Sequence, residues 1–129
     1  TQNPSGGGNG EGGSGGGATG VGIAGGLGGA GTANSITGTS VTYATGGDGG
    51  RKLTSVGTNG AVNTGEGGDR GNDYASGNPF AGGSGIVVIS YANTFPDLTS
   101  IGGGLTYTKT TSGGNTIYTF TAGTGTVTV

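Results

Sequence analysis

The distribution of apolar residues divides the chain into a sparse first part and a richer last part. Ile86–Tyr91 (IVVISY) is a continuous apolar run between Gly-rich and Asn-rich segments, which predicts a buried strand. Leu105–Thr111 (LTYTKTT) alternates larger side chains with threonines, and Thr116–Thr121 (TIYTFT) places Tyr118 and Phe120 on one face. These patterns are typical of antiparallel strands with β-branched and aromatic faces.

Two turn sequences connect the strands of this last part. Ser112–Asn115 (SGGN) joins the two alternating segments, and Ala122–Gly125 leads into Thr126–Val129. Residues 86–129 therefore predict an antiparallel meander of about four strands, which is stable only if its apolar face is covered. The end of the chain is expected to be an unpaired β edge, available to another subunit through Val127 and Val129.

Glycine in the first part follows a period of three. The chain has 38 glycines, of which seven lie after residue 85. In steps of three from Gly7 to Gly31, every position except Thr19 is Gly. The preceding frame is apolar over its second half, namely at Ala18, Val21, Ala24, Leu27 and Ala30. A helix with three residues per turn would place the glycines on one edge and the apolar residues on another.

This period predicts polyglycine-II-like segments, hydrogen-bonded laterally into an array that we call the glycine lattice. The Gly edge admits a neighbouring backbone, since no Cβ intervenes, and the apolar edge is expected to face a shared core. The alternative interpretation is a flexible Gly/Ser linker. Within the Gly-rich part, Asn34–Tyr43 reads as a short strand or hairpin, and Leu53–Val62 is a weaker candidate of the same kind.

These patterns together predict an all-β fold in two domains. Residues 1–85 form the glycine-rich, polyglycine-II-like domain, and residues 86–129 form an antiparallel β module. The β module is expected to be a small meander or sandwich that covers the glycine lattice or is covered by it.

Composition argues against catalysis. The chain has no Cys, His, Met or Trp, and these residues supply most nucleophilic, metal-binding and redox chemistry. We therefore predict no enzyme activity and no cofactor. The net charge is −2 and the four basic residues form no stripe, which excludes a nucleic-acid surface. The longest apolar run is too short to cross a bilayer, so no membrane insertion is expected.

The densest group of acids lies in the segment Gly65–Asp73 (GEGGDRGND). Part of it is like one turn of a calcium-binding nonapeptide repeat, which makes Glu66, Asp69 and Asp73 candidate calcium ligands. Such repeats share each calcium between successive turns, and this chain has a single copy. A solvated acidic loop with Arg70 as a local partner is therefore the favoured alternative. A two-carboxylate glycosidase is disfavoured, because Gly-rich loops give its acids no rigid support.

The five tyrosines are candidate platforms for stacking sugars. Four of them are in predicted strands, where packing against a neighbouring sheet is the favoured interpretation: Tyr43, Tyr91, Tyr107 and Tyr118. Tyr74 lies in a loop together with Phe80, so these two are the expected contacts with a receptor or another subunit.

Three segments carry a family resemblance: NSITGTSVTYATGGDGG, GGSGIVVISY and YTFTAGTGTVTV. They resemble glycine-rich domains of tailed-phage structural proteins, including tail-fibre and adhesin-like proteins and relatives in environmental viral sequences. Gly83–Tyr91 matches the GSGIVxxxY strand of such domains, and Tyr118–Val129 matches their YxFTxxGTxxV strand pair. The resemblance implies an extracellular or virion-surface location.

On this basis we expect a non-enzymatic structural subunit or module of an extracellular fibre or filament, assembled from copies of itself. The alternative is a receptor-binding adhesin tip that contacts a bacterial surface polysaccharide or protein.

Overall fold

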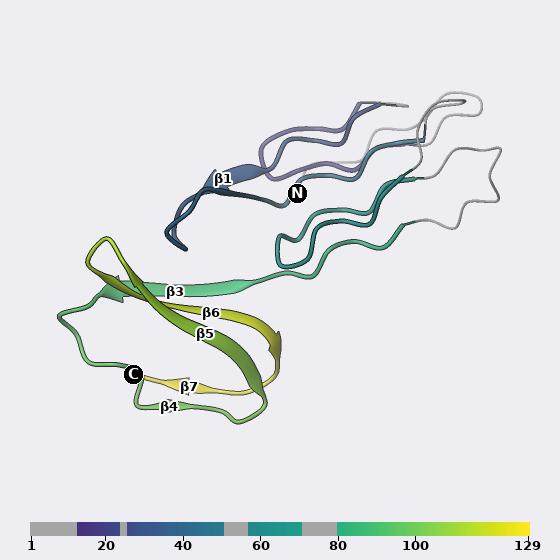
Figure 1. The fold of residues 1–129 in the computed structure, drawn as a ribbon. Helices are drawn as coiled ribbons and strands as arrows, with labels where there is room; N and C mark the ends of the chain where they lie inside the picture. Colours follow the sequence, from purple (N-terminus) through teal and green to yellow (C-terminus); the bar gives the residue numbers. More distant parts are fainter. Residues whose placement is uncertain (1–12, 24–25, 51–56, 71–79) are drawn as a thin grey trace. The chain divides into compact units, whose positions relative to one another are not determined.

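A computed structural model describes residues 13–23, 26–50, 57–70 and 80–129 (Figure 1). These residues contain β-strands in small antiparallel sheets and no helix, so the predicted all-β class is confirmed for them. The strands are β1 (Thr32–Asn34), β2 (Val41–Tyr43), β3 (Val87–Ala92), β4 (Ser100–Ile101), β5 (Leu105–Ser112), β6 (Asn115–Gly123) and β7 (Val127–Thr128).

The chain forms two compact units. The first unit comprises residues 1–33 and 41–85, and the second comprises residues 34–40 and 86–129. The second unit contains the longer strands, while most described residues of the first lie outside any strand.

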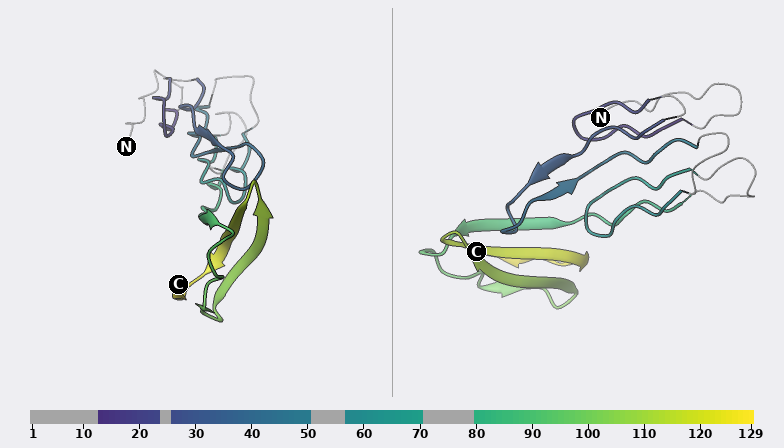
Figure 2. Two further views of the ribbon diagram at one scale, coloured as in Figure 1. Left: turned by 90° about the vertical axis from the view of Figure 1, so that its left-hand side faces the viewer. Right: turned by 45° about the horizontal axis from the view of Figure 1, so that its top comes forward.

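The second unit is built around a three-stranded antiparallel sheet in the order β3-β6-β5 (Figures 1 and 2). Gly113 and Gly114 connect β5 to β6 with φ values of 56° and 79°. Two consecutive positive φ angles are those of a type I′ turn, whose twist matches that of the flanking strands. The turn sets the register, with Ser112 opposite Asn115 and Lys109 opposite Tyr118. The predicted strands and the turn between them are thus confirmed.

The predicted meander order is wrong. β3 pairs with β6 and not with β5, so β6 has a neighbour on both edges. The chain after β6 therefore cannot extend the sheet, and it turns away at Gly123, where φ is 97°. β7 pairs instead with β4, with Val127 opposite Ile101. This pairing uses one edge of β7, and Val129 beyond it is 91% exposed. The expected contact of Val127 and Val129 with another subunit stays a prediction.

The core of the second unit is small and lies on β6. Tyr118 and Phe120 are 3% and 8% exposed on one face, and Ile117 is 2% exposed on the other. The face shared by Tyr118 and Phe120 was predicted from the alternation, and it is confirmed. β3 was expected to be buried, but it is half-buried, and its Val87 is 61% exposed.

β1 and β2 form a two-stranded sheet, and residues 35–40, which belong to the second unit, connect them. This hairpin confirms the prediction for Asn34–Tyr43, although its first strand begins two residues earlier, at Thr32. The weaker candidate Leu53–Val62 lies partly outside the described residues, and its described residues 57–62 contain no strand.

The remaining described segments of the first unit run beside one another and are joined by backbone hydrogen bonds (Figure 1). The bonds recur at a spacing of three residues. The amides of Gly15 and Ala18 donate to the carbonyls of Gly47 and Ala44, and each of these bonds is 2.9 Å long. A β ladder would repeat at two residues along each strand, so the contact between these segments is not a β-sheet.

The same spacing recurs between other pairs of segments. Residues 44–50 bond to residues 26–31 through Gly46 N to Gly29 O and Gly49 N to Gly26 O, at 2.9 and 2.8 Å. Residues 64–70 bond to the same residues 44–50 in parallel orientation, again three residues apart: Gly67 N to Thr45 O and Arg70 N to Asp48 O. Residues 80–83 bond to residues 66–69 in antiparallel orientation: Phe80 N to Asp69 O and Gly83 N to Glu66 O.

Glycine makes this close approach of backbones possible. A Cβ atom on Gly28 would fall on the carbonyl group of Gly46, and one on Gly46 would fall on the carbonyl of Gly15. Other lattice glycines meet a neighbouring carbonyl oxygen in the same way, among them Gly17, Gly29, Gly47, Gly60, Gly68 and Gly83. Such spacing brings Cα–H groups against carbonyl oxygens, a weak but repeated attraction. The interior of the first unit is therefore made of backbone.

The described residues of the apolar edge predicted from the sequence do not face a shared core of other described residues. Val21 and Leu27 are 62% and 61% exposed, and Ala18 and Ala30 are exposed as well. Ala24 lies outside the described residues. The glycines take the inside because a Cβ there would overlap the backbone of a neighbouring segment, and the side chains of Val21 and Leu27 consequently point outward.

Candidate binding surfaces

Carboxylates form hydrogen bonds between the segments of the first unit. The Asp69 carboxylate accepts hydrogen bonds from the Asp48 amide at 2.9 Å, the Thr58 amide at 2.9 Å and the Thr58 hydroxyl at 2.8 Å. Partial burial raises the pKa of Asp69, but these hydrogen bonds outweigh the burial and hold the pKa below its ordinary value. Asp69 therefore acts as an acceptor that joins three segments of the first unit.

Two further acids act in the same way. The carboxylate of Asp48 accepts from the Gly28 amide, and that of Glu66 accepts from the Ala61 amide, both at 2.7 Å. The predicted calcium ligands Glu66 and Asp69 thus accept hydrogen bonds from backbone amides, and Asp73 lies outside the described residues. Among the described residues there is no group of three acids that could hold a metal ion. Calcium binding stays a prediction.

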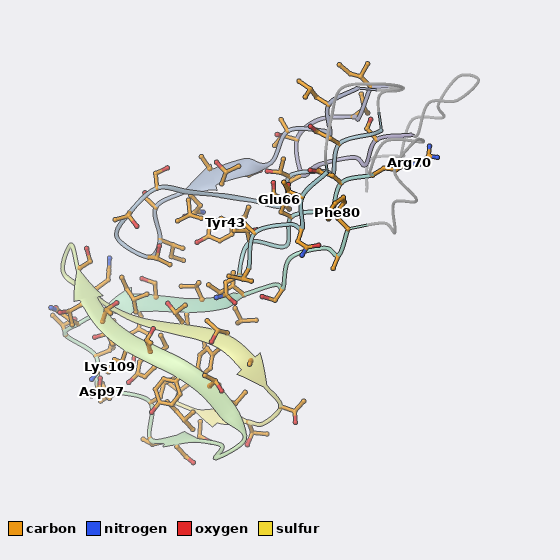
Figure 3. All side chains as sticks on the ribbon, turned by 45° about the vertical axis from the view of Figure 1, so that its right-hand side comes forward. Tyr43, Glu66, Arg70, Phe80, Asp97 and Lys109 are labelled. Carbon is orange, nitrogen blue, oxygen red and sulfur yellow. The ribbon has the colours of Figure 1, made fainter. Side chains whose placement is uncertain are left out.

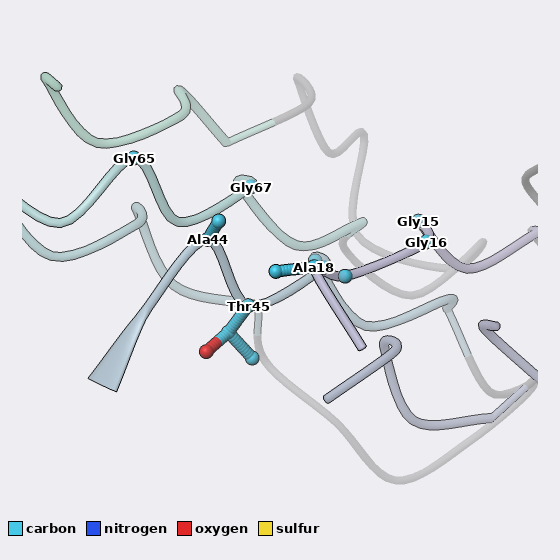
Figure 4. A pocket seen from close by; sticks show the side chains of 10 residues that line it. Gly15, Gly16, Ala18, Ala44, Thr45, Gly65 and Gly67 are labelled. Atoms are coloured by element: carbon cyan, nitrogen blue, oxygen red, sulfur yellow. The ribbon is translucent and has the colours of Figure 1, made fainter. Parts of the chain in front are cut away.

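A shallow groove of about 390 Å³ lies on the glycine lattice (Figure 4). Seven of its ten lining residues are glycines, and the other three are Ala18, Ala44 and Thr45. Ala44 has a φ of 55°, a left-handed conformation that is costly for a residue with a Cβ. The groove offers backbone groups and one hydroxyl, with no charged side chain, so it has no means for acid–base chemistry.

The loop contacts expected from the sequence are only partly described. Phe80 is half-buried and lies against Gly57, where an added Cβ would be 2.6 Å from the ring atom Cδ2. This ring is thus at least partly a packing element of the lattice. Tyr74 lies outside the described residues, and the role of both aromatics in contacts with other molecules stays a prediction.

Three apolar side chains form an exposed edge of the lattice: Val21, Ile23 and Leu27, which are 62%, 64% and 61% exposed. The Ile23 amide donates to the Leu27 carbonyl at 3.1 Å, so the last two residues are close to each other. The buried Ser14 hydroxyl donates to the Ile23 carbonyl at 2.6 Å. We call Val21, Ile23 and Leu27 the aliphatic edge, to distinguish them from the apolar edge predicted from the sequence.

A row of aromatic rings lies on one face of the sheet in the second unit. Tyr118 lies 6.2 Å from Tyr91, 6.1 Å from Tyr107 and 6.5 Å from Phe120, measured between ring centroids. These separations are typical of favourable aromatic pairs. The expectation that strand tyrosines pack against neighbours is confirmed for the buried Tyr118, but Tyr107 is 42% exposed.

A charge pair flanks this aromatic row. The Lys109 ammonium bonds to the Asp97 carboxylate and lies 5.9 Å from the centroid of the Tyr118 ring (Figure 3). The hydrogen bond between them lowers the pKa of Asp97 and raises that of Lys109. Burial raises the pKa of Tyr118, and the neighbouring Tyr91 hydroxyl raises it further.

The Tyr91 hydroxyl is buried. Among the described residues its oxygen has no hydrogen-bond partner.

In the part of the chain that the structure describes, no helix is long and apolar enough to cross a membrane. Comparisons with protein-family models, with curated proteins and with solved structures find no match to this chain. The function is therefore argued from the geometry above.

Proposed function

We propose that this chain is a non-enzymatic structural module of an extracellular fibre, of the kind found in tailed-phage appendages, and that it assembles with copies of itself. Its first unit is a polyglycine-II-like bundle. The observation that carries the proposal is the three-residue spacing of backbone hydrogen bonds, with glycine at many of the positions where two segments meet. Three residues per turn is the geometry of polyglycine II and of related extended helices.

A backbone interior suits a rigid extended module. The hydrogen bonds run sideways between segments, so rows of segments add stiffness without a large apolar core. The carboxylates of Asp69 and Asp48 add further hydrogen bonds between segments by accepting from backbone amides. A flexible linker, the alternative interpretation of the composition, would have neither of these features.

The aliphatic edge of Val21, Ile23 and Leu27 is the proposed assembly surface. Three large aliphatic side chains, each more than half exposed, are costly to leave in water unless another surface covers them. The partner favoured by the charge distribution is a second copy, because the net charge of −2 produces little repulsion between identical chains.

Assembly is tested by sedimentation and electron microscopy of the full chain and of the triple variant Val21→Ser, Ile23→Ser, Leu27→Ser. We expect oligomers or filaments from the original sequence and a shift to monomers for the variant. The matched control is Val62→Ser, which removes a 75% exposed side chain from the same unit and should leave assembly unchanged. A compact monomer of the original sequence at micromolar concentration would contradict the proposal.

Hydrogen exchange tests the bundle independently of assembly. The amides of Ala18, Gly46 and Gly67 donate to neighbouring segments, so they should exchange slowly in the native protein. Exchange of these amides at the rate of an unstructured peptide would support the linker interpretation instead.

A receptor-binding adhesin tip is the second candidate, and one observation favours it. Tyr107 presents an exposed ring on a rigid sheet, next to a fixed pair of opposite charges. Such a surface can bind another molecule without any assembly of the chain.

A further inference from the structure

Two neighbouring aromatic rings, those of Phe120 and Tyr118, support the ring of Tyr107. Its centroid lies 5.6 Å from that of Phe120 and 6.1 Å from that of Tyr118, with interplanar angles of 36° in both pairs. Both supporting rings are buried, whereas Tyr107 is 42% exposed. An aromatic ring fixed in this way loses little conformational freedom when a ligand stacks on it.

Lys109 and Asp97 provide polar groups beside this ring. Lys109 follows Tyr107 by two residues on β5, so both side chains lie on the same face of the sheet. The side chains of Lys109 and Asp97 are 40% and 55% exposed, and each restrains the other through their ion pair. An ammonium group has three donors and a carboxylate accepts about four hydrogen bonds, so the pair keeps donors and acceptors for a ligand.

We propose that Tyr107, Lys109 and Asp97 form a binding site for an uncharged pyranose unit of a polysaccharide. A pyranose has one face of C–H groups that can stack on an aromatic ring, and its hydroxyls both donate and accept hydrogen bonds. The site supplies the same combination. This inference rests on the receptor-binding candidate and not on self-assembly.

The charges on the surface determine the class of saccharide. Asp97 already neutralises Lys109, so an acidic polysaccharide gains no unpaired cation here, and it meets the carboxylate as well. A purely apolar partner would have to remove both charges from water, which is expensive. A neutral sugar avoids both costs, because its hydroxyls replace the water around the ion pair.

The test is NMR titration of the full chain with three soluble probes: maltohexaose, cellohexaose and the hexamer of N-acetylglucosamine. We expect at least one to bind at millimolar concentration and to shift the signals of the Tyr107 ring and of Lys109. The substitution Tyr107→Leu keeps apolar contact with Phe120 and Tyr118 but removes the stacking ring, and it should weaken binding about tenfold. Tyr107→Phe should retain most of the affinity.

Two controls separate binding from folding and from assembly. Thr108→Ala alters the opposite face of the same strand and should leave affinity unchanged. Sedimentation of Tyr107→Leu should match that of the original chain, so that a failure of the fibre proposal and a failure of this site give different results.

Three results would overturn the site: no binding of any of the three probes, equal affinity for the Tyr107→Leu variant, or equal weakening by Thr108→Ala. A loss of oligomers on Tyr107→Leu without any sugar binding would show that this face contacts a second copy instead.

Discussion

Replacing Gly28 by Ala tests the backbone interior directly. The added Cβ would fall on the carbonyl group of Gly46 and lie 2.9 Å from the Gly47 oxygen, and all of these atoms belong to the backbone. A flexible side chain could move aside, but a neighbouring backbone moves only if the whole segment shifts. Segments 26–31 and 44–50 must therefore separate for the methyl group to fit.

The cost follows from the bonds that such a separation breaks. Two backbone hydrogen bonds join these segments, Gly46 N to Gly29 O and Gly49 N to Gly26 O, and each is worth about 0.5–1.5 kcal/mol. The bond from the Gly28 amide to the Asp48 carboxylate involves a charged acceptor and adds about 1.5–3 kcal/mol. Alanine recovers about 0.4–1 kcal/mol by restricting the unfolded chain. We expect a net loss of about 3 kcal/mol, a large part of the 5–15 kcal/mol typical of a folded domain.

Native-state hydrogen exchange of the Gly46 and Gly49 amides measures this loss within the first unit. The matched control is Gly85→Ala, because a Cβ at Gly85 would have no heavy atom within 4 Å; it should change stability by less than about 0.5 kcal/mol. If Gly28→Ala proves as stable as Gly85→Ala, the segments do not pack through their glycines, and the description of the interior as backbone is wrong.

Three other substitutions probe separate features. Asp69→Asn should make the stability of the first unit less sensitive to acid, as thermal melts at several acidic pH values would show. Hydrogen bonds hold the pKa of Asp69 below its ordinary value, so the carboxylate stabilises the fold fully above the ordinary pKa, and this stabilisation is lost as the pH falls through the folded pKa. Ala44→Gly relieves a left-handed backbone with φ of 55° and should raise stability by up to about 1 kcal/mol in urea denaturation; a loss would mean that the Ala44 methyl group has a packing role. Gly114→Ala places a Cβ at a φ of 79° in the β5–β6 turn and should lower the free energy of unfolding by about 1 kcal/mol; Gly114→Asn should lower it less. Equal melting temperatures of the two variants would count against the type I′ turn.

Local patterns predicted the longer strands well. β5 and β6 alternate in sequence and are joined by Gly113 and Gly114, so their pairing needs information from neighbouring residues only. The pairing of β3 with β6 is a contact between distant segments, which an alternating pattern does not determine. β4 has two residues, Ser100 and Ile101, and is too short to produce a pattern. The pairing of β7 with β4 could therefore not be predicted from the sequence.

The glycine period predicted that backbones would approach each other, but it did not predict which edge would be inside. Hydrophobicity indicated an inward-facing apolar edge, whereas Val21 and Leu27 are outside. A side chain can be ranked by its burial preference, but a hydrogen bond between two backbones leaves no trace in such a ranking. The role of Asp69 could not be predicted for a similar reason, because its carboxylate accepts hydrogen bonds from amides 11 and 21 residues away in the sequence.

The backbone interior of the first unit separates two tasks that most folds combine. Where Gly28 and Gly46 meet, the two backbones are in direct contact, and the Asp48 carboxylate is the side chain that bonds across them. The outward-facing side chains between such glycines consequently contribute little to the stability of the fold. Mutation can replace them without changing the packing of the interior. A scaffold of this kind is suited to rapid diversification: selection can rewrite what the surface displays while the glycine positions keep the shape constant.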